Sequence, residues 1–332
     1  MKVGLVAPLA AAMSACVGCV RADAAPAPLV MERTITLPKV AGRIDHLAID
    51  PANRRLIVAE LANDTVDIVD LERGGVVHRI SDLHEPQGLA FDLAGRTIIV
   101  AEGTGGDARL FDAESFRPVA TIALGEDADN VRIDPRNGHA IVGYGRGALA
   151  VVDLDSHTVL SRIALPAHPE SFQIEPGDGR VFVNLPGAHT IGVVDLDRTT
   201  LLQTWHLPYL LGNFPLALEP GPTRLAVVFR MPARLVVFDR RNGSEEARET
   251  TCGDSDDLFF DSPRRRLYAV CGSGSVDVFE VSGDRLRRAG KVSTNPGART
   301  ALFVPALDRL FVAARAKRGD PDAAILVFRP TP

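Results

Sequence analysis

Short runs of apolar, often β-branched residues recur along the chain and are separated by turn-forming residues. The stretch RIDHLAIDPANRRLIVAELANDTVDIVDL contains three such runs, at His46–Ile49, Leu56–Ala59 and Val66–Val69. Asp-Pro-Ala-Asn and Ala-Asn-Asp segments lie between these runs. Apolar runs bounded by Pro, Asn and Asp predict β-strands joined by turns. We therefore expect three successive strands in this stretch.

The same pattern returns six more times, which makes the chain a repeat protein. The register is set by the residue that ends the first strand of each copy: Asp50, Asp92, Asp134, Glu175, Glu219, Asp261 and Val304. These positions are 42, 42, 41, 44, 42 and 43 residues apart. A period of roughly 40–50 residues with four strands per unit is typical of β-propellers. The sequence predicts an all-β, seven-bladed β-propeller of four-stranded blades.

The two ends of the repeat region complement each other. The last copy ends at 325–328 and lacks a fourth strand. The segment VMERTITLP, near Met31–Leu37, resembles the fourth-strand sequences VVHRIS, PVATIAL and VLSRIAL of other copies. We expect it to complete the last blade and to close the ring, because closure removes exposed sheet edges. Residues 25–332 then form a single domain.

Acidic residues end the third strand of nearly every copy. Recurrence in equivalent turns favours a structural role, in which the carboxylate accepts hydrogen bonds from turn amides. These residues are Asp70, Asp112, Asp153, Asp195, Asp239 and Glu280.

The first 24 residues have the pattern of a secretory signal peptide. An early Lys2 precedes an apolar run, and Ala22-Asp23-Ala24 supplies a small-residue cleavage site. The segment is too short and too weakly flanked for a membrane span, so we expect no transmembrane segment. A lipoprotein acylated at Cys16 is the less favoured alternative. The expected location is periplasmic or secreted.

The charge distribution bears on the choice of partners. The net charge is −5, and basic and acidic residues are interspersed. Phosphate-backbone binding needs clustered Lys and Arg, so we expect no nucleic-acid partner. We expect a monomer that binds a small molecule or a protein.

Two cysteines, Cys252 and Cys271, remain after the signal peptide. In an oxidising compartment an even pair suggests a disulfide, and the repeat register brings both residues to the same face of the ring. Two separate thiols are the alternative.

Polar residues that differ from blade to blade precede the inner strands, beside the predicted axis. Structure alone does not require so many different polar groups at one level of a ring. The predicted ligand-binding residues at this mouth are Asp45, His46, Glu60, Gln87, Glu102, Asp129, Asn130, Glu170, Ser171, Asn213, Asp256, Asp257 and Arg299. His168 precedes Glu170 and could reach the mouth, but a loop histidine without a role in the site is the favoured interpretation.

Converging carboxylates repel one another unless a cation or hydrogen-bond donors compensate them. A divalent cation is the cofactor that they suggest, with Asp45, His46 and Asp257 as candidate ligands. Ca²⁺ suits an oxygen-rich set, and His46 would suit a transition metal. The alternative is that Arg299 and the amides satisfy the carboxylates, with water filling the axial channel.

The units TVDIVDL and RLIVAE, repeated every 42 residues or so, resemble the YVTN repeats of YncE-like propellers. The resemblance covers residues 30–328 and implies a secreted or periplasmic ring, in a family generally regarded as binding proteins. No H-E-x-x-H, C-x-x-C-H, G-x-S-x-G or P-loop pattern is present. The favoured hypothesis is a non-enzymatic binding or scaffold protein that recognises its ligand at the mouth.

Two alternatives remain open. The mouth also resembles those of propeller lactonases and lyases, which implies a metal-assisted enzyme. His46 would be its general base, Glu170 or Asp257 an acid or metal ligand, and Arg299 the oxyanion stabiliser. An accessory subunit similar to those of quinoprotein dehydrogenases is the third hypothesis.

Overall fold

The computed structural model describes Met1 and residues 27–221, 223–283 and 285–332. The predicted signal peptide, its cleavage site and Cys16 lie outside the described residues. The described chain is all-β, apart from three single-turn 3₁₀ helices, η1 (Leu61–Asn63), η2 (Pro186–Ala188) and η3 (Pro305–Leu307).

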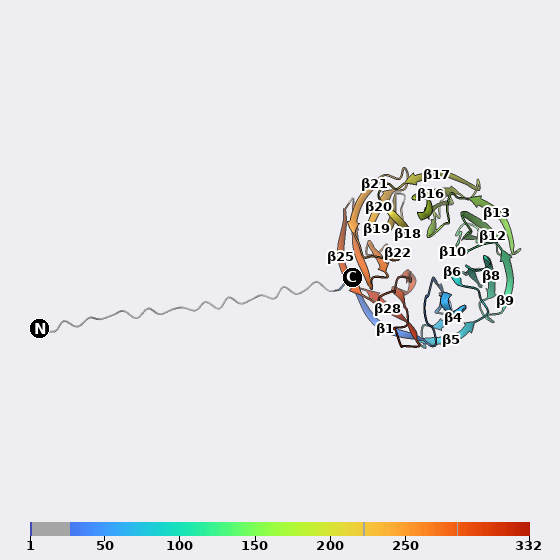
Figure 1. Ribbon diagram of the computed structural model, residues 1–332, viewed down its shortest axis with the longest axis horizontal. Helices are drawn as coiled ribbons and strands as arrows, with labels where there is room; N and C mark the ends of the chain where they lie inside the picture. Colours follow the sequence, from blue (N-terminus) through green and yellow to red (C-terminus); the bar gives the residue numbers. More distant parts are fainter. Residues whose placement is uncertain (2–26, 222, 284) are drawn as a thin grey trace.

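Seven antiparallel four-stranded sheets surround a central axis (Figure 1), which confirms the predicted seven-bladed ring. Blade 1 comprises β2 (Leu47–Asp50), β3 (Arg55–Glu60), β4 (Thr65–Asp70) and β5 (Gly75–Ile80). Blade 2 comprises β6 (Pro86–Asp92), β7 (Thr97–Glu102), β8 (Asp107–Asp112) and β9 (Pro118–Ala123). Blade 3 comprises β10 (Ala128–Ile133), β11 (Ala140–Tyr144), β12 (Ala148–Asp153) and β13 (Thr158–Ala164). Within each blade the strands follow one another outward from the axis.

The next three blades have the same order. Blade 4 comprises β14 (Phe172–Ile174), β15 (Arg180–Leu185), β16 (Thr190–Asp195) and β17 (Thr200–His206). Blade 5 comprises β18 (Leu211–Leu218), β19 (Arg224–Met231), β20 (Ala233–Asp239) and β21 (Glu245–Thr250). Blade 6 comprises β22 (Ser255–Asp261), β23 (Arg266–Cys271), β24 (Ser275–Ser282) and β25 (Arg285–Ser293).

Blade 7 joins the two ends of the repeat region. It contains β26 (Ala301–Val304), β27 (Arg309–Ala314) and β28 (Ala323–Pro330), and its outer strand is β1 (Leu29–Leu37). β1 pairs with β28 from Leu29 opposite Pro330 to Leu37 opposite Ala323. Figure 1 shows the two strands side by side where the ring closes. The predicted closure by the N-terminal strand is confirmed.

A recurring irregularity shows that β1 is a true fourth strand. In each of the other six blades, the pairing between the third and fourth strands contains one register shift. The β28–β1 pair has the same shift, between Met31 and Arg33. Such shifts are bulges that bend a strand and increase its twist. The N-terminal strand therefore has the geometry of the fourth strands from the interior of the chain.

The hydrophobic core is divided among the blade interfaces. Each of seven buried apolar clusters joins two neighbouring blades. At the closing interface, Ile35 and Leu37 of β1 pack with Leu47 and Leu56 of blade 1. Sheets packed face to face bury alternate residues on both faces, which explains the apolar runs of the sequence.

The acids that end the third strands hold their turns, as predicted, in five of the six blades concerned. Asp70 Oδ1 accepts hydrogen bonds from the amides of Glu72 and Arg73, at 2.8 and 2.9 Å. Equivalent bonds to turn amides are made by Asp112, Asp153, Asp195 and Asp239. Glu280 differs, because it pairs with Arg266 and Arg287.

Candidate functional site

The mouth of the ring contains a narrow crevice built by residues that precede the inner strands. Equivalent positions of a repeat form a circle in a propeller, so residues far apart in sequence meet here. The crevice has a volume of about 20 Å³ and is lined by Arg43, Asp45, His46, Asp129, Asn130, Glu170, Ser171, Phe214 and Asp256. Seven of these nine were predicted from the sequence. Arg43 and Phe214 are the additions.

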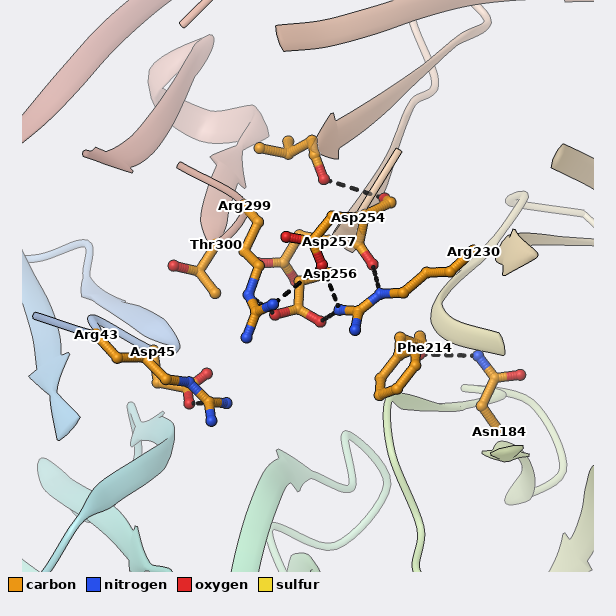
Figure 2. A network of polar contacts seen from close by, with 12 residues as sticks. Arg43, Asp45, Asn184, Phe214, Arg230, Asp254, Asp256, Asp257, Arg299 and Thr300 are labelled. Carbon is orange, nitrogen blue, oxygen red and sulfur yellow. Dashed lines mark hydrogen bonds and ion pairs between the residues drawn. The ribbon is translucent and has the colours of Figure 1, made fainter. Parts of the chain in front are cut away.

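One side of the mouth, which we call the paired side, is a compact network of ion pairs (Figure 2). Asp256 Oδ1 lies 2.5 Å from Arg230 Nη2, and Asp256 Oδ2 lies 2.7 Å from Arg299 Nε. Arg299 Nη1 also donates to Asp254 Oδ1 at 3.0 Å. The Arg230 guanidinium lies 3.7 Å from the centre of the Phe214 ring, a cation–π contact. Each of these four charged side chains therefore has a partner of opposite charge.

A disulfide adjoins the paired side. Cys252 and Cys271 are bonded, with their Cα atoms 5.9 Å apart. Cys252 lies two residues before Asp254, and the Asp254 carbonyl accepts a hydrogen bond from the Gly272 amide at 2.8 Å. The bridge therefore joins two segments that position the Asp254 carboxylate.

The opposite side, which we call the acid-rich side, is arranged differently. His46 Nε2 lies 3.9 Å from Asp45 Oδ1 and 3.8 Å from Asp129 Oδ1. His168 Nε2 lies 3.8 Å from the second oxygen of Asp129. Arg43 is 2.6 Å from Asp45. On this side, His46 thus lines the crevice with three carboxyl groups, and His168 contacts one of them, Asp129, from beside it.

His168 belongs to this side although the sequence favoured a loop position without a role. Its Nδ1 lies 2.6 Å from the Gly145 carbonyl oxygen and 3.6 Å from Asp127. Burial opposes a charge on the ring, but contacts with Asp129 and the Gly145 carbonyl outweigh it and raise the pKa of His168 to about 9. The ring is therefore cationic at neutral pH. Its position, two residues before a predicted site residue, is the sequence signal that could have included it.

Glu170 is the least satisfied acid of the crevice. No hydrogen bond or ion pair joins its carboxyl group to another side chain in the part of the chain that the structure describes. Burial, reinforced by the nearby Asp129 and Asp256, raises the pKa of Glu170 to about 8, although His168 and Arg230 oppose the shift. Burial also raises the pKa of Asp45 to about 7, against the influence of Arg43. Asp129 behaves oppositely, because His168 and His46 hold its pKa below the usual value in spite of its burial.

The other predicted ligand-binding residues do not line the crevice. Glu60 accepts from Thr65 and lies 3.8 Å from Arg79, and Glu102 accepts from the His84 amide. Asn213 is fully buried and donates to Asn184 and to the Thr190 carbonyl. Gln87 donates to Asp127 at 3.1 Å. These side chains bind their own or neighbouring blades.

Asp257 lies in a second hollow. This axial cavity, of about 360 Å³, runs along the inner strands, and its walls include His46, Arg132, Gln173, Asp257 and Phe259. His46 lines both the crevice and the cavity, so the two adjoin. Asp257 Oδ2 accepts a hydrogen bond from the Ala301 amide at 2.7 Å, and burial raises the pKa of Asp257 to about 6. The candidate metal ligands Asp45 and Asp257 therefore belong to different hollows.

Within residues 27–221, 223–283 and 285–332, no three His, Cys, Asp or Glu side chains are grouped as a metal site requires. In the same ranges, no helix is long and apolar enough to cross a membrane.

Fold and topology define the chain as a seven-bladed β-propeller. No family model matches the sequence, and no curated protein matches it. The fold is widespread among solved structures, since 1806 chains match it. One is hydrazine synthase of Kuenenia stuttgartiensis, with a TM-score of 0.75 over 88% of this chain and 97% of that chain. The two sequences are 15% identical, a level at which the similarity shows the fold alone.

Proposed function

We propose that this protein is a binding or scaffold propeller whose mouth receives a primary ammonium group, carried by a small ligand or by a protein partner. The observation that carries the proposal is the Glu170 carboxyl, which faces the crevice without a partner among the described residues. Glu170 is half-buried, and a carboxyl group that faces a concave site without a protein partner is a candidate for ligand binding.

Charge supports a cationic ligand. Four acids line the crevice, Asp45, Asp129, Glu170 and Asp256, whereas Arg43 is the arginine among the lining residues. Arg230 and Arg299 are occupied by Asp254 and Asp256. A cation that enters beside Glu170 gives this carboxyl group a partner in a partly desolvated place, where ion pairs are stronger than in water.

The small volume of the crevice favours an ammonium group over a larger cation. A hollow of about 20 Å³ is close to the minimum that holds one water-sized group. An ammonium group is of that size, whereas a planar guanidinium is considerably larger. The proposed ligand therefore presents an amine, such as a lysine side chain, and keeps the rest of its structure outside the crevice.

Binding of an amine is linked to proton release. The raised pKa leaves Glu170 mostly protonated at neutral pH. A bound ammonium favours the carboxylate, so binding expels a proton and the affinity increases as the pH rises from about 6 to about 9. An aliphatic amine remains charged over that range, because its own pKa lies near 10.

Isothermal titration calorimetry with n-butylamine tests the proposal, with n-butanol as the neutral analogue. Wild type binds the amine with proton release, seen as a dependence of the heat on buffer ionisation. Glu170→Gln weakens binding about tenfold or more, since it removes the ionisable group. Glu126→Gln, the same change at an exposed position, leaves affinity unaltered. If wild type binds n-butanol as tightly as n-butylamine, the site does not recognise an ammonium group. If Glu170→Gln binds n-butylamine as tightly as Glu126→Gln does, the site does not depend on Glu170.

Export and family membership are further parts of the proposal. The YVTN-like repeats and the pattern of residues 1–24 support a YncE-like protein that is exported and processed near Ala24. Fractionation of expressing cells and mass measurement of the product test this. A cytoplasmic chain with an intact N-terminus contradicts export.

A metal-assisted lactonase or lyase is the second candidate, favoured by one observation: His46 and the protonated Glu170 line one crevice, and His168 contacts Asp129 beside them. Glu170 would donate a proton and His46 would accept one. Arg299 is engaged by two carboxylates, so it must leave them to stabilise an oxyanion. Turnover of a lactone panel with added Ca²⁺ or Zn²⁺, abolished by His46→Ala, would replace the binding proposal with this one.

A further inference from the structure

The axial cavity contains an arginine, Arg132, that has no part in the crevice. Arg132 lines the cavity, and its Nη1 donates to the Val131 carbonyl oxygen at 2.7 Å. In the part of the chain that the structure describes, no carboxylate oxygen lies within ion-pair distance of this guanidinium. Burial lowers the pKa of Arg132 in spite of the attraction of Asp257 and Asp129. A guanidinium in such a place normally has an anionic partner.

The fold itself does not require an arginine there. In the repeat register defined by Asp50 and its six equivalents, the position two residues earlier is occupied in blades 1 to 7 by Ala48, Ala90, Arg132, Gln173, Ala217, Phe259 and Leu302. Three blades use alanine. A small side chain therefore satisfies the packing at this level, and the long charged side chain in blade 3 is an addition to it.

The walls around Arg132 are mainly apolar. The cavity is bordered by Leu89, Phe91, Ile133, Phe259 and Leu302. The Arg132 guanidinium also lies 5.7 Å from the centre of the Phe172 ring. About 360 Å³ is at the lower end of the range for small-molecule sites, which are mostly apolar with a few polar groups that fix orientation.

We propose that the axial cavity binds a small organic monocarboxylate, whose carboxylate pairs with Arg132 and whose apolar body lies against Phe91, Ile133 and Phe259. Arginine presents a planar fork of donors that matches the two oxygens of a carboxylate. A second negative charge on the ligand would face Asp257 in the same cavity, which disfavours dianions. This site is independent of the ammonium site, because it uses a different hollow and a ligand of opposite charge.

Calorimetry with phenylacetate tests the proposal, using phenylacetamide as the neutral probe and phenylmalonate as the dianion. Wild type binds one phenylacetate and binds the other two more weakly. Arg132→Gln keeps a polar side chain but removes the charge, and it weakens phenylacetate binding about tenfold or more. Arg132→Lys, which keeps the charge without the fork, gives an intermediate affinity.

Arg234→Gln is the matched control. Arg234 also donates to the carbonyl of the preceding residue, at 3.0 Å, but it lies in β20, outside the cavity. Its removal leaves phenylacetate affinity unchanged. Circular dichroism establishes whether each variant is folded. If Arg132→Gln does not fold, the comparison of Arg132→Lys with wild type tests the proposal. The proposal is overturned if wild type binds no phenylacetate up to about 10 mM, or if the folded Arg132 variants bind it as tightly as wild type does.

Discussion

The two sides of the mouth occupy equivalent positions in the repeat but differ in how their charges are satisfied. On the paired side, Asp254 and Asp256 are held by Arg230 and Arg299 at 2.5–3.5 Å. On the acid-rich side, the histidine–carboxylate distances around Asp129 are 3.8 Å, and Glu170 has no partner among the described residues. A closed set of ion pairs holds blades together, whereas an open set remains available to a ligand. This difference is the reason for proposing the acid-rich side, and not the paired side, as the half of the mouth that binds a ligand.

Both sides of the mouth require a closed ring, so the largest effect comes from opening it. A chain that begins at Ile44 lacks β1 and leaves β28 as an exposed edge. It also loses Ile35 and Leu37 from the closing core cluster, and we expect it not to unfold cooperatively. Thermal melting by circular dichroism, with a chain beginning at Ala27 as the control, measures this. A truncated chain that melts like the control would disprove closure by β1.

The disulfide sharpens the comparison because it belongs to the paired side. Replacing Cys252 and Cys271 together by alanine removes a link between residues 19 positions apart. The expected loss is about 3 kcal/mol of unfolding free energy, through the loop entropy of the unfolded chain. Urea denaturation measures it. When the disulfide of the wild type is reduced, the wild type and the double alanine variant should have similar unfolding free energies. Equal unfolding free energies under oxidising conditions would contradict a formed disulfide.

Breaking one ion pair on the paired side tests whether that side is structural. Arg299→Met leaves Asp254 and Asp256 with Arg230 as their shared arginine. We expect a loss of about 1–3 kcal/mol in unfolding free energy, because partly buried carboxylates lose a charged donor. Arg146→Met, at an exposed position, is the control. Amine binding by Arg299→Met should remain near wild type, and its loss would show that the paired side takes part in binding.

The acid-rich side should make stability depend on pH. The pKa of Glu170 is about 8 when folded, against 4.5 as the ordinary value, so the folded chain binds the proton more tightly. The stability that protonated Glu170 contributes is therefore fully present below about pH 4.5, and it is lost as the pH rises toward 8. Glu170→Gln should remove about 1–2 kcal/mol of that loss. Urea denaturation at pH 6 and 9 measures it, and parallel pH profiles for the two proteins would contradict the assignment.

The sequence predicted the architecture well because a repeat period is a global signal. The spacing of Asp50, Asp92 and their equivalents defined seven blades, and the likeness of Met31–Leu37 to other fourth strands located the closure. Turn acids such as Asp70 could be assigned from recurrence alone. These features depend on backbone pattern, which the apolar runs specify.

The site was harder to predict, because a repeat position gives the level of a residue in the ring but not the direction of its side chain. Glu60 ends its strand at the expected face, yet it contacts Thr65 and Arg79 of its own blade. His168 reaches Asp129 from a loop whose conformation the period does not define. Arg132 follows the positions considered for the mouth, and only its contrast with the alanines of other blades could have revealed it.

The most direct test of the ammonium site is the titration of the Glu170 carboxyl itself, followed by carbon-13 NMR with and without n-butylamine. We expect a midpoint near pH 8 in the free protein, and a clearly lower midpoint when the amine is bound. A free midpoint at the ordinary value for glutamate, or one that the amine does not move, would contradict a Glu170-based ammonium site.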